Sequence, residues 1–342
     1  MPLRRLLLGL TLPTGIALAA MVLANIPWIQ HWQLSSLTLA ILLGMVAGNL
    51  GQRFIPVTWK PGIHFAQNRL LRLGIVLYGF RLSFQQVADV GLSGLLVDFA
   101  VIASTFMMGY WIGTRWLKID RETTMLTAAG ASICGAAAVL ATEPVVQGKP
   151  HQTAMAVATV VLFGTLGMFI YPLMQSLLLH WPDHLMGIYT GATIHEVAQV
   201  VAASHAMGEG VTEVAVITKL TRVLLLAPFL IVLSVFLQRK NTHVSENKIK
   251  NFMANSIPWF AVLFVMMVGV NSLGVVPGKF IPMINQFDGL VLTIAMAALG
   301  LESHVGKLRG VGPRPLLLAL FLFAWLVLGG FVLTDAINAW VS

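Results

Sequence analysis

The sequence has very few charged residues. Only 10% of its 342 residues are Asp, Glu, Lys or Arg, whereas about a quarter of the residues of an average soluble protein are charged. Hydrophobic residues make up 57% of the chain, and no polar stretch is long enough to form a second domain. The composition argues against an ordinary soluble protein. It predicts one membrane-embedded domain that covers residues 1–342.

The sequence also lacks most of the motifs that identify enzymes and metal sites. A single cysteine, Cys134, excludes an internal disulfide and a cysteine-based metal cluster. The residue four positions after His195 is Gln199, so the HExxH spacing of zinc enzymes is absent. No P-loop is present, so ATP would act only through a partner. We expect no enzyme activity, no metal and no cofactor.

The formal charge of +8 could suggest a nucleic-acid partner. The Lys and Arg residues are scattered between apolar runs, however, and form no basic face, so we expect no nucleic-acid binding. A lipid bilayer is the partner that the composition predicts.

Apolar runs long enough for transmembrane helices recur along the whole chain. A spanning helix needs about 20 apolar residues. The first run follows Arg4 and Arg5 as in a signal peptide, but ten more runs follow it, so we interpret it as a retained helix. The predicted spans are 7–26, 34–50, 64–82, 94–113, 123–143, 153–178, 184–205, 213–237, 257–274, 284–302 and 316–339.

The basic residues between the spans predict the orientation in a bacterial inner membrane. Cytoplasmic segments carry an excess of Lys and Arg. With the N-terminus in the cytoplasm and the C-terminus in the periplasm, only Lys149 and Lys279 lie on the periplasmic side. The polar segment 238–256 becomes a cytoplasmic loop. The cytoplasmic residues are Arg4, Arg5, Arg53, Lys60, Arg115, Lys118, Arg121, Arg239, Lys240, Lys248, Lys250, Lys307, Arg309 and Arg314.

Short internal similarities indicate a duplication. Three of them, at offsets of 150 to 161 residues, pair spans that lie five apart, and an odd number of spans reverses the orientation. They predict an extra N-terminal helix over 1–33, a first repeat over 34–180 and an inverted second repeat over 181–342. Two further similarities do not fit this scheme: Gly130–Ile133 with Gly191–Ile194, and Gly79–Gly91 with Gly300–Gly312.

Ionisable residues inside spans are candidates for function because they are costly in a membrane unless paired or hydrated. Arg72 and Arg222 each lie near the middle of a predicted span, and Arg69 and Lys219 precede them by one helical turn. In an inverted repeat, Arg72, Arg222 and Lys219 would converge on the membrane centre and bind an anion. The alternative is that they form structural ion pairs with acidic residues of neighbouring spans.

A second group of polar residues could couple transport to an ion. His195, Glu196 and Gln199 lie together near the middle of one span, and a histidine can carry protons near neutral pH. The alternative is a buried polar brace between helices. Asp98 is a further proton-site candidate inside its span, and Glu143 is either interfacial or part of the pathway.

A stretch of small residues, Thr127–Ala138, allows either close helix packing or a broken helix. A break would leave free N–H groups at the positive end of a second half-helix, which is suited to anions. The substrate-binding candidates here are Ser132, Ile133, Cys134 and Gly135, with Thr193 in the similar segment Gly191–Ile194.

Five segments, Leu39–Met45, Leu73–Leu82, Gly130–Val139, Ala141–Pro144 and His195–Ala202, together resemble the YeiH-type sulfate exporter family. That family is related to sodium/proton antiporters and bile-acid symporters. The resemblance implies inverted five-helix repeats, a core of crossed broken helices and a separate panel of helices. It also implies export of sulfate, sulfite or a small sulfonate.

The sequence therefore predicts an all-α secondary transporter that exports a small sulfur-containing oxyanion with proton coupling. A sodium-coupled uptake carrier for a small organic anion and a channel remain open alternatives. A homodimer is compatible with the sequence.

Overall fold

The computed structural model describes residues 3–26, 35–51, 55–238, 259–303 and 312–341. All regular elements in these ranges are helices, and none of the ranges contains a β-strand, which confirms the all-α prediction. The predicted cytoplasmic loop at 238–256 lies, except for Gln238, outside the described residues.

Each predicted span coincides with one helix or with consecutive helical segments. Six of these segments are long and apolar enough to cross a membrane, and the total number of crossings stays a prediction. The helices are α1 (Leu3–Ala24), α3 (Ser36–Leu50), α4 (Lys60–Phe65), α5 (Leu71–Tyr78), α6 (Phe84–Trp111), α7 (Arg121–Ser132), α8 (Ala136–Val146), α9 (Pro150–Met174), α10 (Asp183–Thr193), α11 (Val197–His205), α12 (Glu209–Leu224), α13 (Leu226–Gln238), α15 (Trp259–Ser272), α16 (Ile281–Glu302) and α17 (Pro313–Val341).

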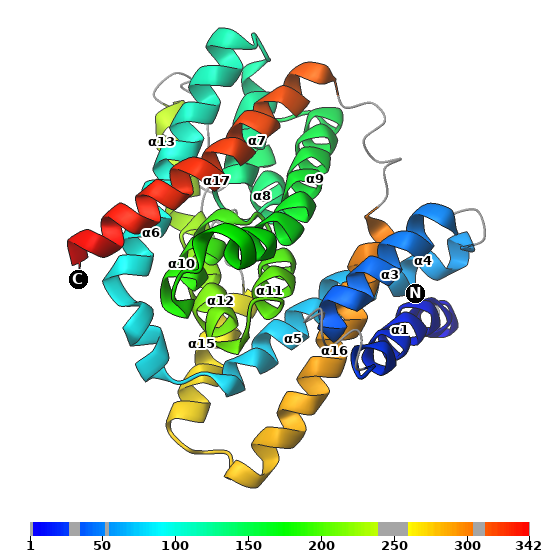
Figure 1. The fold of residues 1–342 in the computed structure, drawn as a ribbon. Coiled ribbons are helices and arrows are strands. Elements are labelled where there is room, and N and C mark those ends of the chain that lie inside the picture. The colour runs from blue at the N-terminus through cyan, green and yellow to red at the C-terminus, as the bar shows by residue number, and fades with distance from the viewer. Residues whose placement is uncertain (1–2, 27–34, 52–54, 239–258, 304–311, 342) are drawn as a thin grey trace. The chain divides into compact units, whose positions relative to one another are not determined.

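The helices group into two compact units (Figure 1). Unit 1 comprises Met1–Asp89, His205–Gly208 and Trp259–Lys307, and unit 2 comprises the rest of the chain. Gly91, with φ +45°, kinks α6 close to the boundary between them. Each unit is made of several separate stretches of the sequence, whereas each predicted repeat is one continuous range. The repeat boundaries and the single domain stay predictions.

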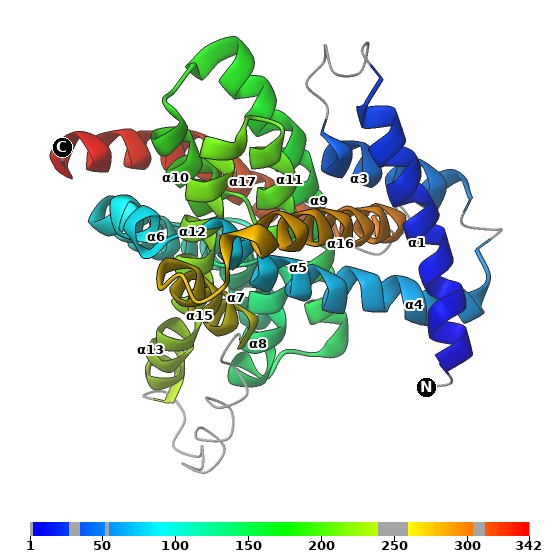
Figure 2. The same ribbon diagram turned by 90° about the horizontal axis from the view of Figure 1, so that it is seen from below.

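Unit 1 is held together by close contact between helix backbones. Helices α1, α3 and α16 pack against one another (Figure 2). A Cβ on Gly44 or Gly48 of α3 would collide with backbone atoms of α16, and one on Gly300 of α16 would collide with the carbonyl of Ile41. Small residues permit this close approach. Inside a bilayer the hydrophobic effect does not drive helices together, so close packing stabilises their association instead.

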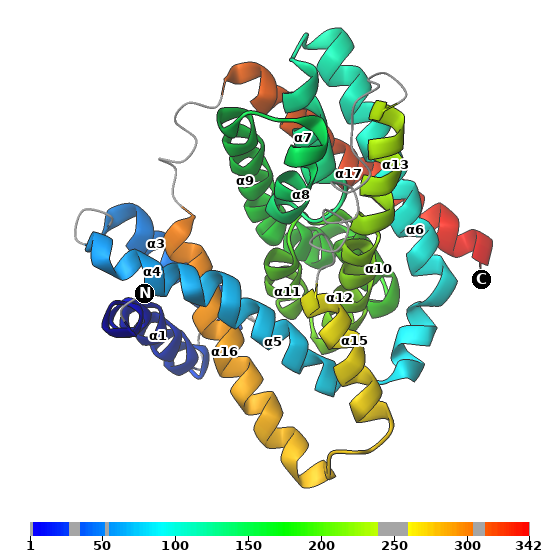
Figure 3. The ribbon, with the colours of Figure 1, turned by 180° about the vertical axis from the view of Figure 1, so that it is seen from behind.

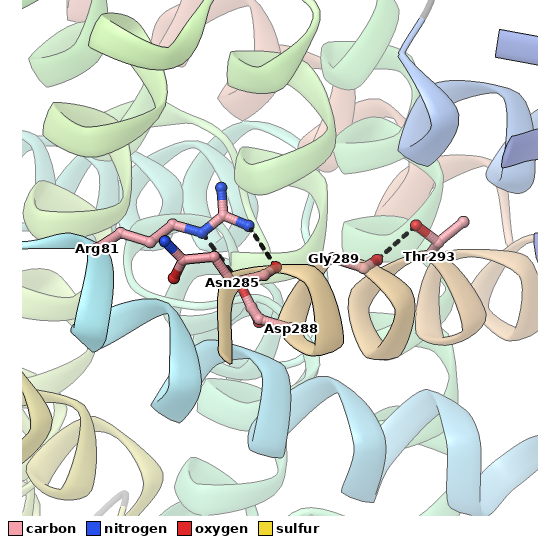
Figure 4. A network of polar contacts seen from close by, with 5 residues as sticks. All are labelled: Arg81, Asn285, Asp288, Gly289 and Thr293. Carbon is pink, nitrogen blue, oxygen red and sulfur yellow. Dashed lines mark hydrogen bonds and ion pairs between the residues drawn. The ribbon is translucent and has the colours of Figure 1, made fainter. Parts of the chain in front are cut away.

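An ion pair adds a polar contact to unit 1 (Figure 4). Arg81 closes the 3₁₀ turn Gly79–Arg81 after α5, and its Nε lies 3.2 Å from Oδ2 of Asp288 in α16. The same guanidinium donates a hydrogen bond to the carbonyl of Asn285 at 3.2 Å. Asp288 is fully buried, so its charge is offset by a partner at salt-bridge distance.

Unit 2 contains the remaining long helices. Helix α17 packs across α7, α9 and α10 (Figure 1), while α12 packs along α10 and α13 contacts α8 (Figure 3). An apolar cluster between these helices is formed by buried residues of α7, α8, α9 and α13, including Leu126, Val139, Val160 and Leu233. This packing holds the interrupted helices in place.

Two helices of unit 2 are broken in the middle. Helix α7 ends at Ser132 and α8 begins at Ala136, while α10 ends at Thr193 and α11 begins at Val197. The break predicted between Gly130 and Gly135 is confirmed.

The two breaks occupy equivalent positions in the similarity between Gly130–Ile133 and Gly191–Ile194, which the repeat scheme does not explain. Gly130–Ile133 and Gly191–Ile194 each contain the last residues of a first half-helix and the first residue beyond it. The repeat scheme instead pairs the first broken span with α16, which is continuous from Ile281 to Glu302. The local backbone therefore supports the similarity between the two breaks.

Candidate functional site

Helix α12 carries two basic side chains into the interior of unit 2. Lys219 and Arg222 lie one turn apart, and both have no exposed surface. Helix α12 reaches this position because Gly191 of α10 allows the backbone of Ala215 to approach closely. Two buried cations require compensating partners, since an uncompensated buried charge is strongly unfavourable.

The Lys219 ammonium connects the two breaks. Its Nζ donates to the carbonyl of Ile133 at 2.8 Å and to the carbonyl of Ile194 at 2.7 Å. These are the first residues after the half-helices α7 and α10, where carbonyls lack helical partners and the helix dipole is negative. One positive charge thus stabilises both half-helix ends.

Arg222 binds the same two ends one or two residues earlier. Its Nε donates to the carbonyl of Ser132 at 2.8 Å, and its Nη2 donates to Ala131 O at 3.2 Å and also to Ser132 O. Its Nη1 donates to the carbonyl of Ala192. The sequence predicts that this guanidinium binds a substrate anion, whereas in the structure these donors bind backbone carbonyls.

A carboxylate lies at the N-terminal end of the half-helix α8, where the helix dipole is positive. Oε1 of Glu196 accepts a hydrogen bond from the N–H of Ala136, the first residue of α8, at 3.3 Å. Gly135 makes room for it, because a Cβ there would lie 2.5 Å from Cγ of Glu196. Glu196 is partly buried and Ala137 is exposed, so this half-helix end is accessible at the surface of unit 2.

Gln199 positions Glu196. Its Oε1 accepts the backbone N–H of Glu196 at 3.1 Å, which caps α11. The amide group packs directly on Gly164 of α9, where a Cβ would collide with it. This contact was not apparent from the sequence, because an isolated glycine in an apolar helix is uninformative. The geometry favours a capping role for Gln199.

Asp98 of α6 is the third charged residue in the interior. Its side chain is fully buried, and neither carboxylate oxygen has a hydrogen-bond partner within the described residues. Both Arg222 and Lys219 are near enough to act on it electrostatically. Asp98 therefore lies in the electrostatic field of both cations without a hydrogen bond to either.

The remaining predicted polar groups at the breaks are buried. The hydroxyls of Ser132 and Thr193 donate to carbonyls of their own helices, those of Ala129 and Tyr189. The structure thus directs the Ser132 hydroxyl, predicted as a donor for the substrate, into its own helix.

Two further side chains at the breaks are buried. The Cys134 thiol is free, and the ring of His195 lies 6.5 Å from that of Phe323 of α17. His195 Nδ1 has no hydrogen-bond partner in the part of the chain that the structure describes.

Two further predicted site residues are Arg72 in unit 1 and Glu143 in unit 2. Arg72 belongs to unit 1, where its side chain is exposed and its guanidinium lies 5.8 Å from the ring centroid of Phe260. Glu143 lies near the far end of α8, about 10 Å from Ala136 at 1.5 Å per residue. Arg72 thus belongs to a different unit from Arg222, and their convergence stays a prediction. Across the described ranges, no group of three or more His, Cys, Asp or Glu side chains could ligate a metal.

The fold and this cluster define a helical membrane protein whose interior contains two broken helices and buried charges. The chain belongs to the family described as Conserved hypothetical protein 698, which matches residues 8–319.

Its relatives are membrane proteins of bacteria. It is 48% identical to a UPF0324 membrane protein of Pseudomonas aeruginosa, over 97% of this chain and 94% of that protein. It is 46% identical to the UPF0324 inner membrane protein YeiH of Escherichia coli, over 98% of this chain and 95% of that protein. No solved structure matches significantly. The resemblance drawn from the motifs is confirmed, as is the inner membrane as the setting of the family.

Proposed function

We propose that this protein is a secondary transporter for a small anion, and that it exports a sulfur-containing oxyanion such as sulfate or sulfite from the cytoplasm. One observation carries the proposal: two broken helices meet two buried cations, Lys219 and Arg222, that bind both breaks at once. The sulfur chemistry and the outward direction rest on the family resemblance.

Physical cost supports a functional role for this arrangement. Breaking a helix inside a membrane removes backbone hydrogen bonds, so irregular backbone occurs there only where protein or a water-filled cavity surrounds it. Transporters use such breaks because half-helix ends provide binding groups at membrane depth. A purely structural bundle would be more stable with continuous helices.

The accessible end of α8 is the position that we assign to the anion. Ala136 is partly buried and Ala137 is exposed, and N–H groups in the first turn of a helix bind anions. The Glu196 carboxylate holds this position in the structure. We propose that the anion binds when Glu196 becomes protonated and swings away from the N–H of Ala136, which would couple anion movement to a proton.

A sodium-coupled uptake carrier is the weaker alternative. Sodium needs several oxygen ligands, and the carbonyls of Ile133 and Ile194 at the breaks already accept hydrogen bonds from Lys219. A cation would also be repelled by the neighbouring ammonium and guanidinium groups.

A thermal-shift experiment on the detergent-purified protein tests the proposal. Sulfate, sulfite, thiosulfate and bicarbonate are each added as sodium or choline salts, because a ligand that binds only the folded protein raises its melting temperature. We expect stabilisation by at least one anion with either cation, loss of that stabilisation in Arg222→Ala, and its retention in Lys149→Gln, which changes an exposed lysine. Stabilisation by sodium alone would refute the anion site.

A further inference from the structure

Asp98 differs from the other fully buried aspartate of the described chain. Asp288 in unit 1 is ion-paired with Arg81 at 3.2 Å, which is the usual way to retain a buried carboxylate. The two oxygens of Asp98 have no hydrogen-bond donor among the residues described, and an unpartnered buried carboxylate is expensive. Its presence therefore calls for an explanation other than local stability.

The nearest cations cannot turn toward Asp98 without releasing the half-helix ends. Lys219 donates to Ile133 and Ile194, and Arg222 donates to the carbonyls of Ser132 and Ala192. Asp98 thus acts on them through its charge. Next to it, Gly94 of α6 faces the Thr218 hydroxyl, so a Cβ on that glycine would lie 3.7 Å from Oγ1. This contact places Asp98, one helical turn from Gly94 on α6, beside the stretch of α12 that carries Lys219.

The net charge of the three side chains follows directly. With Lys219 and Arg222 protonated and Asp98 ionised, the three side chains carry one net positive charge. The Glu196 carboxylate is not counted, because in the proposed function it is protonated and displaced when the anion binds. The sum is the same if a proton moves from Lys219 to Asp98, because both groups then become neutral. In a low-dielectric interior a net charge has to be matched, so one positive charge selects one negative charge.

We propose that Asp98 sets the valence of the transported anion by reducing the charge of the Lys219–Arg222 pair from two to one, so that the site accepts monovalent anions such as hydrogen sulfite or a sulfonate in preference to divalent sulfate. The inference rests on the proposed function and narrows its substrate class. Asp98 acts as a specificity-determining residue that need not touch the anion. Discrimination arises because a divalent anion would leave one uncompensated negative charge.

Two anions of similar shape isolate valence as the variable. Methanesulfonate and sulfate are both tetrahedral at sulfur and fully ionised near neutral pH, but they carry one and two charges. Their dissociation constants are measured by calorimetry on the full-length protein in detergent. We expect the wild-type protein to bind methanesulfonate more tightly, and Asp98→Asn to shift the affinity ratio toward sulfate by about tenfold or more, as expected for one additional charge in a partly buried site.

Further variants complete the charge series. Lys219→Met leaves no net charge and should lose binding of both anions, while Asp98→Asn combined with Lys219→Met restores one positive charge and should recover methanesulfonate binding. Asp288→Asn removes the ion-paired carboxylate of unit 1 and should leave the affinity ratio at the wild-type value. Because the ratio is measured on bound ligand, partial loss of folded protein does not change it.

The outcomes separate this inference from the proposed function. If the wild-type protein binds neither these anions nor those of the thermal-shift panel, the anion site itself is refuted. If it binds anions but prefers sulfate, or if Asp98→Asn leaves the ratio within twofold of wild type, the valence role of Asp98 is refuted and the anion transporter stands.

Discussion

Lys219 and Arg222 stabilise the fold before they serve any substrate. The ends of α7 and α10 each direct unpaired carbonyls toward α12, and both basic side chains donate to carbonyls of both ends. Helix dipoles favour cations at C-terminal ends and anions at N-terminal ends, and Glu196 at the start of α8 completes that pattern. Charge and backbone are matched at each half-helix end.

Replacing Lys219 by methionine should therefore destabilise the protein. The substitution retains much of the side-chain volume but removes both hydrogen bonds to the breaks, at a cost of about 3 kcal/mol in the free energy of unfolding. Thermal melting of the purified protein measures it, with Lys149→Met as the control at an exposed position. Equal melting temperatures for the two variants would contradict the assigned role.

Gly135 provides a second test at the first break. Its φ of +67° with ψ of −132° is available only to glycine, and a Cβ would collide with Glu196. We expect Gly135→Ala to lower the melting temperature more than Gly274→Ala, whose φ is +63° but whose Cβ would meet no atom within 4 Å.

Truncating Glu196 shows whether the collision matters. The double variant Gly135→Ala with Glu196→Ala removes the colliding Cγ and should regain part of the lost stability. A double-mutant cycle that includes Glu196→Ala alone accounts for the lost hydrogen bond to Ala136. If the effects of the two single substitutions simply added, the contact between Gly135 and Glu196 would not limit the substitution.

The sequence identifies the charged residues at the breaks, but it does not identify the groups that they bind. Lys219, Arg222 and Glu196 were identifiable because charges are rare inside spans. Their partners are main-chain carbonyls and N–H groups, which every residue possesses, so no sequence pattern reveals them. Arg72 looked equivalent to Arg222 by spacing, but its side chain is exposed in unit 1.

At the scale of helices, two kinds of glycine contact differ in their consequences. Gly300 of α16 meets the backbone of α3, which cannot move aside, whereas a Cβ on Gly289 of the same helix would meet no atom within 4 Å. We expect Gly300→Ala to destabilise unit 1 by about 2 kcal/mol through overpacking and Gly289→Ala to be neutral or stabilising, since alanine favours helix. Comparable melting temperatures for both would contradict the close packing of α3 on α16.

The helices themselves were largely predictable, and their grouping was not. Apolar runs identified the position of each helix, and small residues at Thr127–Ala138 predicted the first break. Local matches in apolar helices arise easily by chance, so sequence similarity alone does not relate the two breaks, whereas the interruption of a helix at both positions does support it. Packing between distant helices decides the division into units, and composition along the chain does not encode it.

At the scale of the whole molecule, the distribution of basic residues predicts a cytoplasmic N-terminus and a periplasmic C-terminus. Fusion of alkaline phosphatase, which is active only in the periplasm, to the C-terminus should give an active reporter, while a fusion within the segment 238–256 should be inactive. The reverse pattern would contradict the predicted orientation and with it the assignment of export as outward movement.

Anion exchange in proteoliposomes tests the central claim most directly. Vesicles containing the purified protein and loaded with unlabelled sulfite, sulfate or methanesulfonate are placed in a trace of the same radiolabelled anion, and a carrier exchanges internal for external substrate without any other driving force. We predict transient accumulation of label for at least one of these anions, absent in protein-free vesicles and in Arg222→Ala but present in Lys149→Gln. Folded, inserted protein that exchanges none of these anions, or an Arg222→Ala variant that exchanges them at the wild-type rate, would contradict a transport site at the broken helices.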